Sequence, residues 1–426
     1  MSVGSAFDER ALALNVRRQW REWSGVFSSS AYAPHIDIEY NAIRNAAALI
    51  DVSPLFKYRV SGPDADRLVD RVITREAAGV APGRVIYTPW CDSAGRVVDD
   101  GTLMRLDDGA WRWTAAEGQL RWLRLNARGL DVSIQDDTDA TAALALQGPL
   151  SRDVLEAAAQ TSLTDLRYFG RRALRIGGIE LDVSRTGYTG DRGYELWIPV
   201  DGALAVWDAL MESGTAYAIR PAGILALDVV RVEAGLIMAG VDYISSQHAL
   251  TPAQSYSPFE LGLGGLVKLD KDVPFVGRAA LRRERDAGGP PRRLVGLDLD
   301  WATWSAYTAG TGCRRHYPPT PGATRSRSTS SASRSGAPPA ARGAWSSRRT
   351  WPLRPSPPPW PSRVRSWRWS GPWRVSAAAS ARRSWHCPSS TRPASAPRAT
   401  PCLHGEERDY GAPLAASAGT KRGSTR

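Results

Sequence analysis

The sequence predicts an α+β fold, in which β-hairpins are joined to amphipathic helices. Apolar and polar residues alternate on both sides of a glycine-rich turn, over 179–184 and 194–200, as in a two-stranded hairpin. Apolar residues recur at helical spacing over 65–73 and 225–236, as in helices that bury one face. The length of 426 residues is sufficient for two or three domains.

The first half of the chain contains elements of both kinds. In order, we expect a helix over 36–52 that runs into a turn, a strand end and helix start at 60–64, a helix over 65–73, and strands at 83–87 and 101–106. Pro63 suits the first turn of its helix. A turn-rich stretch at 91–96 separates the two strands, which predicts a hairpin ending at residues 97–101.

A second unit begins near Ala142. Its expected elements are a strand at 143–146 closed by residues 147–149, a helix at 154–159, the hairpin of 179–200 and the helix of 225–236. If Leu196 faces the core, Glu195 must face the other side of the sheet. In the last helix Arg231 lies just off an apolar face made of Leu225, Val229, Val232 and Leu236.

Charge divides the chain near Asp300. Residues 1–300 carry 34 Lys and Arg against 40 Asp and Glu, whereas residues 301–426 carry 21 basic side chains against three acidic ones. The basic pI therefore belongs to the tail, and the acidic body argues against nucleic acid as its main partner. The tail also holds 9 of the 17 tryptophans and lacks Ile, Phe and Met, so it resembles neither a packed domain nor an ordinary disordered tail.

Several classes of protein are excluded by the body of the chain. No apolar run approaches the roughly 20 residues that span a bilayer, and the charged N-terminus lacks the apolar core of a signal peptide. Cys91 is the single cysteine before the tail, which predicts a cytoplasmic protein without disulfides. With only His35 and His248 in the body, neither a metal site nor a Ser-His-Asp triad is expected.

Residues 184–195 form the most informative stretch. Its three glycines permit positive φ and a close approach of backbone to a ligand, and its tyrosines offer flat surfaces for a planar ring. Glu195 could accept paired hydrogen bonds from an amidine-like ring edge. On these residues alone, a long hairpin loop with an exposed glutamate is an equally good interpretation.

This stretch and seven other short sequence blocks together resemble the aminomethyltransferase (T-protein) family of the glycine cleavage system and its folate-dependent relatives. Eight ordered blocks carry the resemblance, at residues 51–53, 97–100, 146–149, 184–195, 220–223, 231–236, 240–242 and 267–278. They cover residues 35–300. The resemblance departs at the N-terminus and fails after about residue 305.

The resemblance implies a cloverleaf of three domains around a central tetrahydrofolate channel. Residues 1–58 with 142–245 would form a discontinuous folate-binding domain, residues 59–141 an inserted domain, and residues 246–300 a connector and the start of a C-terminal β-barrel. Residues 301–426 would be an out-of-frame or disordered basic tail.

Five residues take site roles through the resemblance. Asp100 matches the essential aspartate placed near the reactive folate nitrogen, and Glu195 matches the carboxylate that grips the pteridine. Arg231 matches the arginine of the folate-site helix. Tyr188 matches an aromatic residue beside the ligand, and Tyr87 is a further pocket residue.

Each of these residues also has an ordinary structural interpretation. Asp99 or Asp100 could cap the turn before the next strand. Arg231 could be a solvated helix residue or an ion-pair partner, and Tyr188 and Tyr87 could be packing residues. Cys91 is expected to be inert, because no base lies nearby in the sequence.

The activity implied by the family is transfer of a one-carbon unit from an aminomethyl-lipoyl carrier, an H-protein-like partner, to tetrahydrofolate with release of ammonia. A fixed carboxylate could stabilise the positive charge that develops at the nucleophilic nitrogen. The alternative is a demethylase acting on a small methylated substrate such as dimethylglycine, sarcosine, dimethylsulfoniopropionate or a methoxy-aromatic compound. A non-catalytic folate-binding protein of iron–sulfur maintenance is disfavoured, since Asp100 is present and a Lys-Gly-Cys-type motif is not.

The tail suggests a frameshift in a GC-rich coding sequence. Residues 385–397 can be encoded so that another frame gives a Pro-Phe-Phe-Asp-Pro ending similar to that of the family, at the place where its last domain should finish. A genuine basic, tryptophan-rich tail that binds nucleic acid or anionic membrane is the competing hypothesis. A real frameshift would remove one wall of the folate channel.

Overall fold

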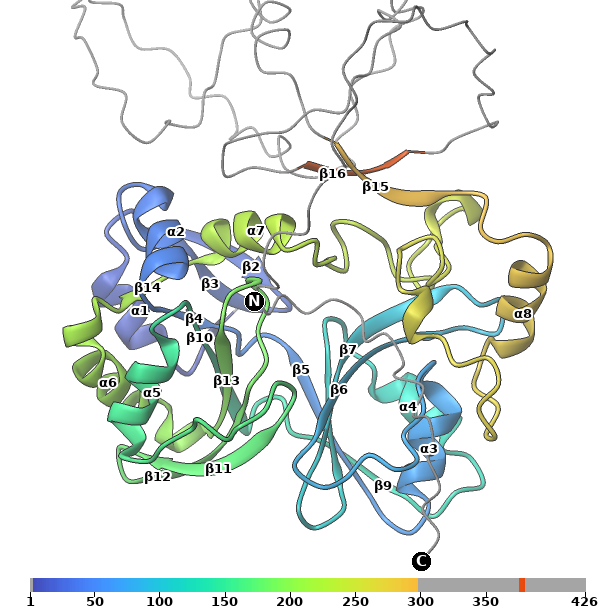
Figure 1. The fold of residues 1–426 in the computed structure, drawn as a ribbon, viewed down its shortest axis with the longest axis horizontal. Coiled ribbons are helices and arrows are strands. Elements are labelled where there is room, and N and C mark those ends of the chain that lie inside the picture. The colour runs from blue at the N-terminus through green and yellow to red at the C-terminus, as the bar shows by residue number, and fades with distance from the viewer. Residues whose placement is uncertain (1–2, 298–374, 380–426) are drawn as a thin grey trace, which may run out of the picture.

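The computed structural model describes residues 3–297 and 375–379, and its main body consists of two sheets side by side, each covered by helices (Figure 1). The first sheet has six strands in the order β11-β12-β13-β10-β4-β14. These are β4 (Ala48–Asp51), β10 (Thr141–Gln147), β11 (Arg171–Ile176), β12 (Ile179–Ser184), β13 (Gly193–Pro199) and β14 (Arg220–Pro221).

Helices cover both faces of the first sheet. Leu144 and Leu146 of β10 pack against α5 (Ser151–Ala159) and α6 (Ala203–Ser213). The alternate residues Ala143 and Ala145 pack against α2 (Ile36–Asn45) and α7 (Ile224–Glu233). Short 3-10 helices follow β13 at Val200–Gly202 and α6 at Thr215–Tyr217. Because both faces are buried, the central strands are apolar almost throughout.

The second sheet has five strands in the order β6-β7-β8-β5-β9. They are β5 (Phe56–Ser61), β6 (Val85–Cys91), β7 (Val97–Arg105), β8 (Trp111–Ala115) and β9 (Ser133–Asp136). Helices α3 (Ala65–Val72) and α4 (Leu120–Asn126) cover one face around the fully buried Trp90, Trp111 and Trp113. The rings of Trp90 and Trp113 meet edge to face with centroids 5.0 Å apart, which favours a rigid core.

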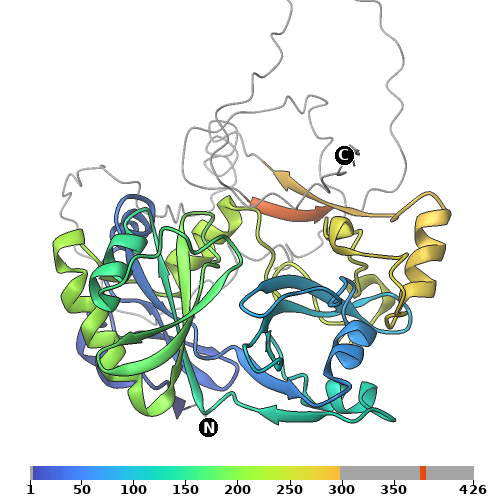
Figure 2. The same cartoon turned by 60° about the horizontal axis from the view of Figure 1, so that its bottom comes forward.

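The two sheets meet at an apolar cluster that we call the joint. It contains Ala145 and Trp197 of the first sheet and Val85 and Met104 of the second. Backbone hydrogen bonds reinforce the joint, since the Val85 amide donates to Phe169 O over 2.9 Å. Figure 2 shows the sheets on either side of this contact.

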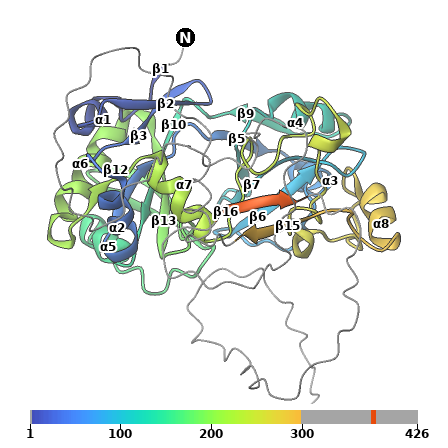
Figure 3. The ribbon, with the colours of Figure 1, turned by 90° about the horizontal axis from the view of Figure 1, so that it is seen from above.

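A small third sheet lies at the N-terminus. Its strands, in the order β1-β3-β2, are Val3–Gly4, Val26–Ala31 and Gln19–Trp23, and α1 (Asp8–Leu14) follows β1. Viewed from above, these elements lie along the six-stranded sheet (Figure 3). Strand β3 contacts α7, and Phe7 packs against Trp207 of α6 with ring centroids 5.5 Å apart.

The segment after α7 crosses to the second sheet and covers the end of the β6–β7 hairpin. It contains short 3-10 helices at Pro252–Gln254 and Gly264–Leu266, then α8 (Arg278–Asp286) and β15 (Arg293–Leu297), which pairs antiparallel with β16 (Val375–Ala379). Tyr243 and Leu281 of this segment pack on Cys91 and Val97. The segment therefore completes the core at that end of the sheet.

Most of the predicted elements are present. Strands β12 and β13 pair antiparallel with Ser184 opposite Glu195, Leu196 is buried, and Glu195 faces the other side of the sheet, as predicted. The α+β class is confirmed. The hairpin of β6 and β7 turns over residues 92–96, and each strand is longer than predicted. The proposed domain boundaries remain a prediction, and residues 301–374 and 380–426 of the tail lie outside the described residues.

Two expectations and one alternative interpretation were wrong. Residues 48–51 form the inner strand β4 instead of the end of a helix and a turn. Asp99 and Asp100 lie within β7 and cap no turn. In α7 the most deeply buried side chains are Ala226, Leu227, Val230 and Arg231, because the helix packs on both the sheet and α2; Leu225 and Val232 of the predicted apolar face are only half-buried.

Candidate active site

Asp100 lies between two tyrosine hydroxyl groups. Tyr87, on the neighbouring strand β6, donates to Asp100 Oδ2 over 2.7 Å. Tyr243, from the segment after α7, donates to Asp100 Oδ1. Both carboxylate oxygens therefore have a hydrogen-bond donor while the side chain stays half-buried. Such a carboxylate is fixed in direction before any ligand arrives.

The backbone around Asp100 explains why a glycine follows it. A Cβ built on Gly101 would lie 2.0 Å from Thr114 O of the adjacent strand β8. Strands β7 and β8 could not approach as they do with any other residue at this position. Gly101 thereby fixes where β7 lies, and with it Asp100.

Asp99 points to the opposite face of β7 and is fully buried. Its carboxylate accepts the Asp100 amide over 2.8 Å and the Glu117 amide over 3.0 Å. Burial, together with the negative charge of Asp100, raises the pKa of Asp99 well above its usual range. The two adjacent aspartates therefore differ: Asp99 accepts backbone amides in the protein core, whereas Asp100 lies on the face of β7 that is turned toward the joint.

Burial also raises the pKa of Asp100, and the hydrogen bonds from Tyr243 and Tyr87 act in the opposite direction. The pKa values of Tyr87 and Tyr243 lie well above the usual range, chiefly because of burial and secondly because of the charge on Asp100. Both phenols therefore stay protonated and keep donating at neutral pH.

Glu195 lies on β13, on the face of the first sheet that packs toward the joint, opposite Ala145. The Thr186 hydroxyl donates to its Oε2 atom. Among the described residues, no hydrogen bond reaches Oε1. Burial raises the pKa of Glu195, and the Thr186 bond opposes this shift. One oxygen of an enclosed carboxylate thus remains for a ligand that carries N–H donors.

Arg231 is a buried ion-pair residue and not a solvated one. It is 2% exposed, and its Nη1 atom donates to Asp242 and, over 3.2 Å, to Leu236 O. Its Nε atom is buried and has no partner in the described part of the chain. An unsatisfied buried donor is costly, and it is a candidate for a bond to a ligand acceptor.

Tyr188 links these groups electrostatically. Its hydroxyl donates to Ile237 O, and its ring packs against the joint. Burial raises its pKa well above the usual range, while the positive charge of Arg231 lowers it and Asp100 raises it. The structure therefore brings Tyr188, Tyr87, Asp100 and Arg231 together, whereas Glu195 makes no hydrogen bond to any of these four.

The glycines of the 184–195 loop have a structural role that the sequence does not reveal. A Cβ on Gly187 or on Gly193 would lie 2.2 or 2.1 Å from Gln147 Oε1. The Thr189 hydroxyl donates to the same oxygen over 3.0 Å. These two glycines make room for the Gln147 side chain. Gly190, with φ of +79°, supplies the left-handed turn.

Two residues that complete the site were not predicted from the sequence. Tyr243 and Asp242 are neighbours in the chain, and they bind Asp100 and Arg231 respectively. Asp242 belongs to one of the blocks that carry the resemblance, so that block contained a signal for it. Tyr243 lies 143 positions from Asp100, and no local pattern indicates their contact.

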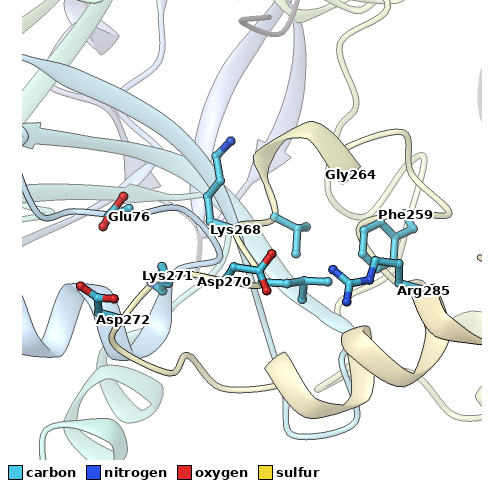
Figure 4. Close-up of a pocket in the computed structure, with 10 residues that line it drawn as sticks. Glu76, Phe259, Gly264, Lys268, Asp270, Lys271, Asp272 and Arg285 are labelled. Carbon is cyan, nitrogen blue, oxygen red and sulfur yellow. The ribbon is translucent and has the colours of Figure 1, made fainter. Parts of the chain in front are cut away.

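Two surface pockets lie away from these residues. One of about 440 Å³ lies between the 3-10 helix Gly264–Leu266, α8 and the 267–272 segment, with Lys268, Lys271, Asp270, Asp272 and Glu76 among its lining residues (Figure 4). The other, of about 300 Å³, is lined by Arg112, Arg171 and Asp182. Neither is lined by any of the five predicted site residues.

Other kinds of centre find little support in the described residues. These contain no group of three or more His, Cys, Asp or Glu side chains placed to hold a metal ion. Cys91 is a free, fully buried thiol, and burial raises its pKa well above the usual range, which makes it unreactive. In the same part of the chain, no helix has the length and hydropathy to cross a membrane.

The site fits tetrahydrofolate on its own chemistry. A pteridine edge presents adjacent N–H donors, and Glu195 Oε1 is an acceptor without a partner among the described residues. The same ring system carries acceptors, and Arg231 Nε is a buried donor without a partner there. Tyr87 and Tyr188 add aromatic surface.

Comparisons with known proteins show the family of the chain. Residues 9–271 match the family described as the GCVT N-terminal domain. The chain therefore belongs to the glycine cleavage T-protein family, whose members include folate-dependent aminomethyltransferases.

Individual relatives differ in what they are named for. An aminomethyltransferase of Streptomyces coelicolor is 37% identical over 265 residues, which cover 61% of this chain and 69% of that protein. An aminomethyltransferase of Geobacillus thermodenitrificans is 36% identical and is covered to 70%. A trimethylamine-oxide aldolase of Ruegeria pomeroyi is 40% identical over 274 residues, 62% of this chain, but the match spans only 33% of that protein.

A solved structure shows the same fold. The aminomethyltransferase T of the glycine cleavage system from Bartonella henselae superposes with a TM-score of 0.60 at 24% identity, over 69% of this chain and 77% of that one. The α+β architecture with its two helix-covered sheets is thus the T-protein architecture.

Proposed function

We propose that this chain binds tetrahydrofolate beside the joint and transfers a one-carbon unit to it. The observation that carries the proposal is the half-buried Asp100 carboxylate, with each oxygen held by a tyrosine hydroxyl. An oriented carboxylate in an enclosed site stabilises positive charge far better than the same group in water.

Each residue has a separate role in this proposal. Glu195 binds the N–H edge of the pteridine, and Arg231 Nε reaches an acceptor of the ligand. Tyr188 and Tyr87 bound the ring, and Tyr87 also holds Asp100. When bound, tetrahydrofolate supplies a nucleophilic ring nitrogen. Asp100 stabilises the positive charge that develops next to that nitrogen and orients it.

The first candidate for the carbon donor is an aminomethyl group on a lipoyl carrier, an H-protein-like partner, with release of ammonia. The relatives named aminomethyltransferase, which match over 61% of this chain, support this donor. The domain division given by the resemblance belongs to the same proposal, with the two sheets as the cores of the first two domains.

The second candidate is a methylated amine oxide, supported by the relative named trimethylamine-oxide aldolase at 40% identity. Loss of one methyl carbon from trimethylamine oxide at the oxidation level of formaldehyde leaves dimethylamine, and the atoms and electrons balance without a further oxidant. A folate-binding chain could accept that carbon.

The test uses the full chain and two donors in parallel. Calorimetric titration with tetrahydrofolate is expected to show saturable binding, and methylenetetrahydrofolate is then measured with aminomethylated lipoyl carrier or with trimethylamine oxide. Product from the carrier supports the aminomethyltransferase, and product from the oxide alone replaces it by the second candidate. Absence of folate binding would overturn both.

A second test concerns residues 301–426, whose coding frame can be checked directly. If the coding frame is broken, resequencing codons 295–400 will find an inserted or missing base, and the restored protein should be assayed beside this chain. A confirmed frame with normal folate binding would show that the tail as given does not prevent folate binding.

A further inference from the structure

The segment that follows α7 connects the two halves of the site through adjacent residues. Asp242 accepts a hydrogen bond from Arg231 of α7, a helix that packs on the first sheet. Tyr243 donates to Asp100 of β7, which belongs to the second sheet. Asp242 also accepts the Met238 amide over 2.8 Å, and this local hydrogen bond fixes the turn of the segment next to Arg231.

The ring and the hydroxyl group of Tyr243 lie in different environments, one apolar and one polar. The side chain is fully buried, and its ring packs in an apolar cluster with Cys91, Val97, Tyr256 and Phe275. The hydroxyl leaves this cluster and reaches Asp100 Oδ1, with Asp99 Oδ1 at 3.4 Å. Packing alone would be satisfied by phenylalanine, so the hydroxyl is the feature that requires explanation.

We propose that Tyr243 is a positioning residue, which holds the Asp100 carboxylate in its working direction from the side opposite Tyr87. The inference rests on the proposed function, because it assigns the direction of Asp100 to the transfer of the one-carbon unit. Tyr243 is the chain neighbour of Asp242, which pairs with Arg231. The proposal therefore places two adjacent residues in contact with two different site residues, Asp100 and Arg231.

The geometry supports this role over simple packing. Tyr87 alone would bind only Oδ2 and leave Asp100 free to turn about its terminal torsion, which is a broad one for aspartate. A second donor on Oδ1 removes that freedom. Two donors also favour the charged carboxylate, which burial disfavours.

The ionisable groups around Asp100 come from four parts of the chain. Asp99 precedes it on β7, Tyr87 faces it from β6, and the segment after α7 contributes Tyr243 and Asp242. Tyr188 of the 184–195 loop also senses its charge. The negative charge of Asp242 opposes ionisation of Asp100, whereas the two hydroxyl donors, Tyr243 and Tyr87, favour it.

The experiment is an infrared titration of the Asp100 carboxyl group, identified as the band that Asp100→Asn removes. In Tyr243→Phe, loss of a charge-assisted hydrogen bond is expected to raise the midpoint by about one pH unit. The matched control is Tyr32→Phe, which also removes a buried phenol hydroxyl. Tyr32 lies in the apolar core between the first sheet and helices α5 and α6, and its hydroxyl bonds Ser29. It is expected to leave the Asp100 midpoint unchanged.

Turnover and binding give the second readout. Tyr243→Phe is expected to lower kcat about tenfold while the Kd for tetrahydrofolate changes by less than about twofold, since the residue acts through Asp100. A folded Tyr243→Phe protein with unchanged midpoint and kcat would overturn the inference. If wild-type protein fails to bind folate, the proposed function fails, while the infrared result still decides whether Tyr243 controls Asp100.

A second variant tests the inference if Tyr243→Phe does not fold. Fluorotyrosine at position 243 keeps the ring and makes the hydroxyl a stronger donor. The Asp100 midpoint is then expected to fall, and an unchanged midpoint would count against the inference.

Discussion

The two carboxylates of the site are held in different ways, although each lies on a strand beside the joint. On the five-stranded sheet, both oxygens of Asp100 accept tyrosine hydroxyl groups. On the six-stranded sheet, Glu195 accepts only the Thr186 hydroxyl among the described residues. A carboxylate with both oxygens occupied is suited to act by its charge, whereas one with a spare oxygen is suited to bind. Under the proposed function, this difference assigns the transfer step to Asp100 and ligand binding to Glu195.

Removing Arg231, the buried ion-pair residue of α7, should have the largest effect. Arg231→Met leaves Asp242 as an unpaired buried charge, and the free energy of unfolding is expected to fall by about 3–5 kcal/mol in chemical denaturation. Arg231→Met combined with Asp242→Asn should recover much of this loss. An equal loss in the single and double variants would show that the ion pair is not the cause.

The second prediction concerns the charge-bearing half. Asp100→Asn keeps the shape and removes the charge, so kcat is expected to fall about 10²–10³-fold. The Kd for tetrahydrofolate should change little, because both oxygens of Asp100 are already occupied by protein donors. Asp108→Asn, at a surface ion pair with Arg59, is the control. A large change in Kd with unchanged kcat would reverse the division of roles.

The third prediction concerns the binding half. Glu195→Gln weakens a charge-assisted contact to the ligand, and the Kd for tetrahydrofolate is expected to rise about 10-fold, with a smaller change in kcat. Calorimetric titration measures the first and saturating turnover the second. Glu180→Gln, two positions into the neighbouring strand β12 and outside the site, provides the control. Unaltered affinity would exclude Glu195 from recognition.

The smallest effect is on stability and has a definite sign with pH. Because burial raises the folded-state pKa of Glu195 above its ordinary value of 4.5, its charge opposes folding at neutral pH. Glu195→Gln should therefore be slightly more stable than wild type at pH 7, by about 0.5–2 kcal/mol. As pH falls through the raised pKa toward 4.5, the wild-type carboxyl takes up its proton and the difference should vanish. A difference that grows on acidification would contradict the assigned shift.

The sequence alone was sufficient for those parts that depend on local pattern. The alternation over 179–200 determines the β12–β13 hairpin and places Leu196 and Glu195 on opposite faces. The ordered blocks identify the family, and they include all the predicted site residues except Tyr87. Helices α3 and α5 follow from apolar spacing, since each buries one face on a single sheet.

Tertiary structure decided the rest, because those features depend on what packs around them. Residues 48–51 are buried on both faces between β10 and β14, so they lack the alternation that marks a strand. Gln147 fills the space above Gly187 and Gly193, and only the packed loop shows this use of glycine. Tyr243 reaches Asp100 because the chain after α7 crosses from one sheet to the other, and no local sequence pattern records a contact made by that crossing.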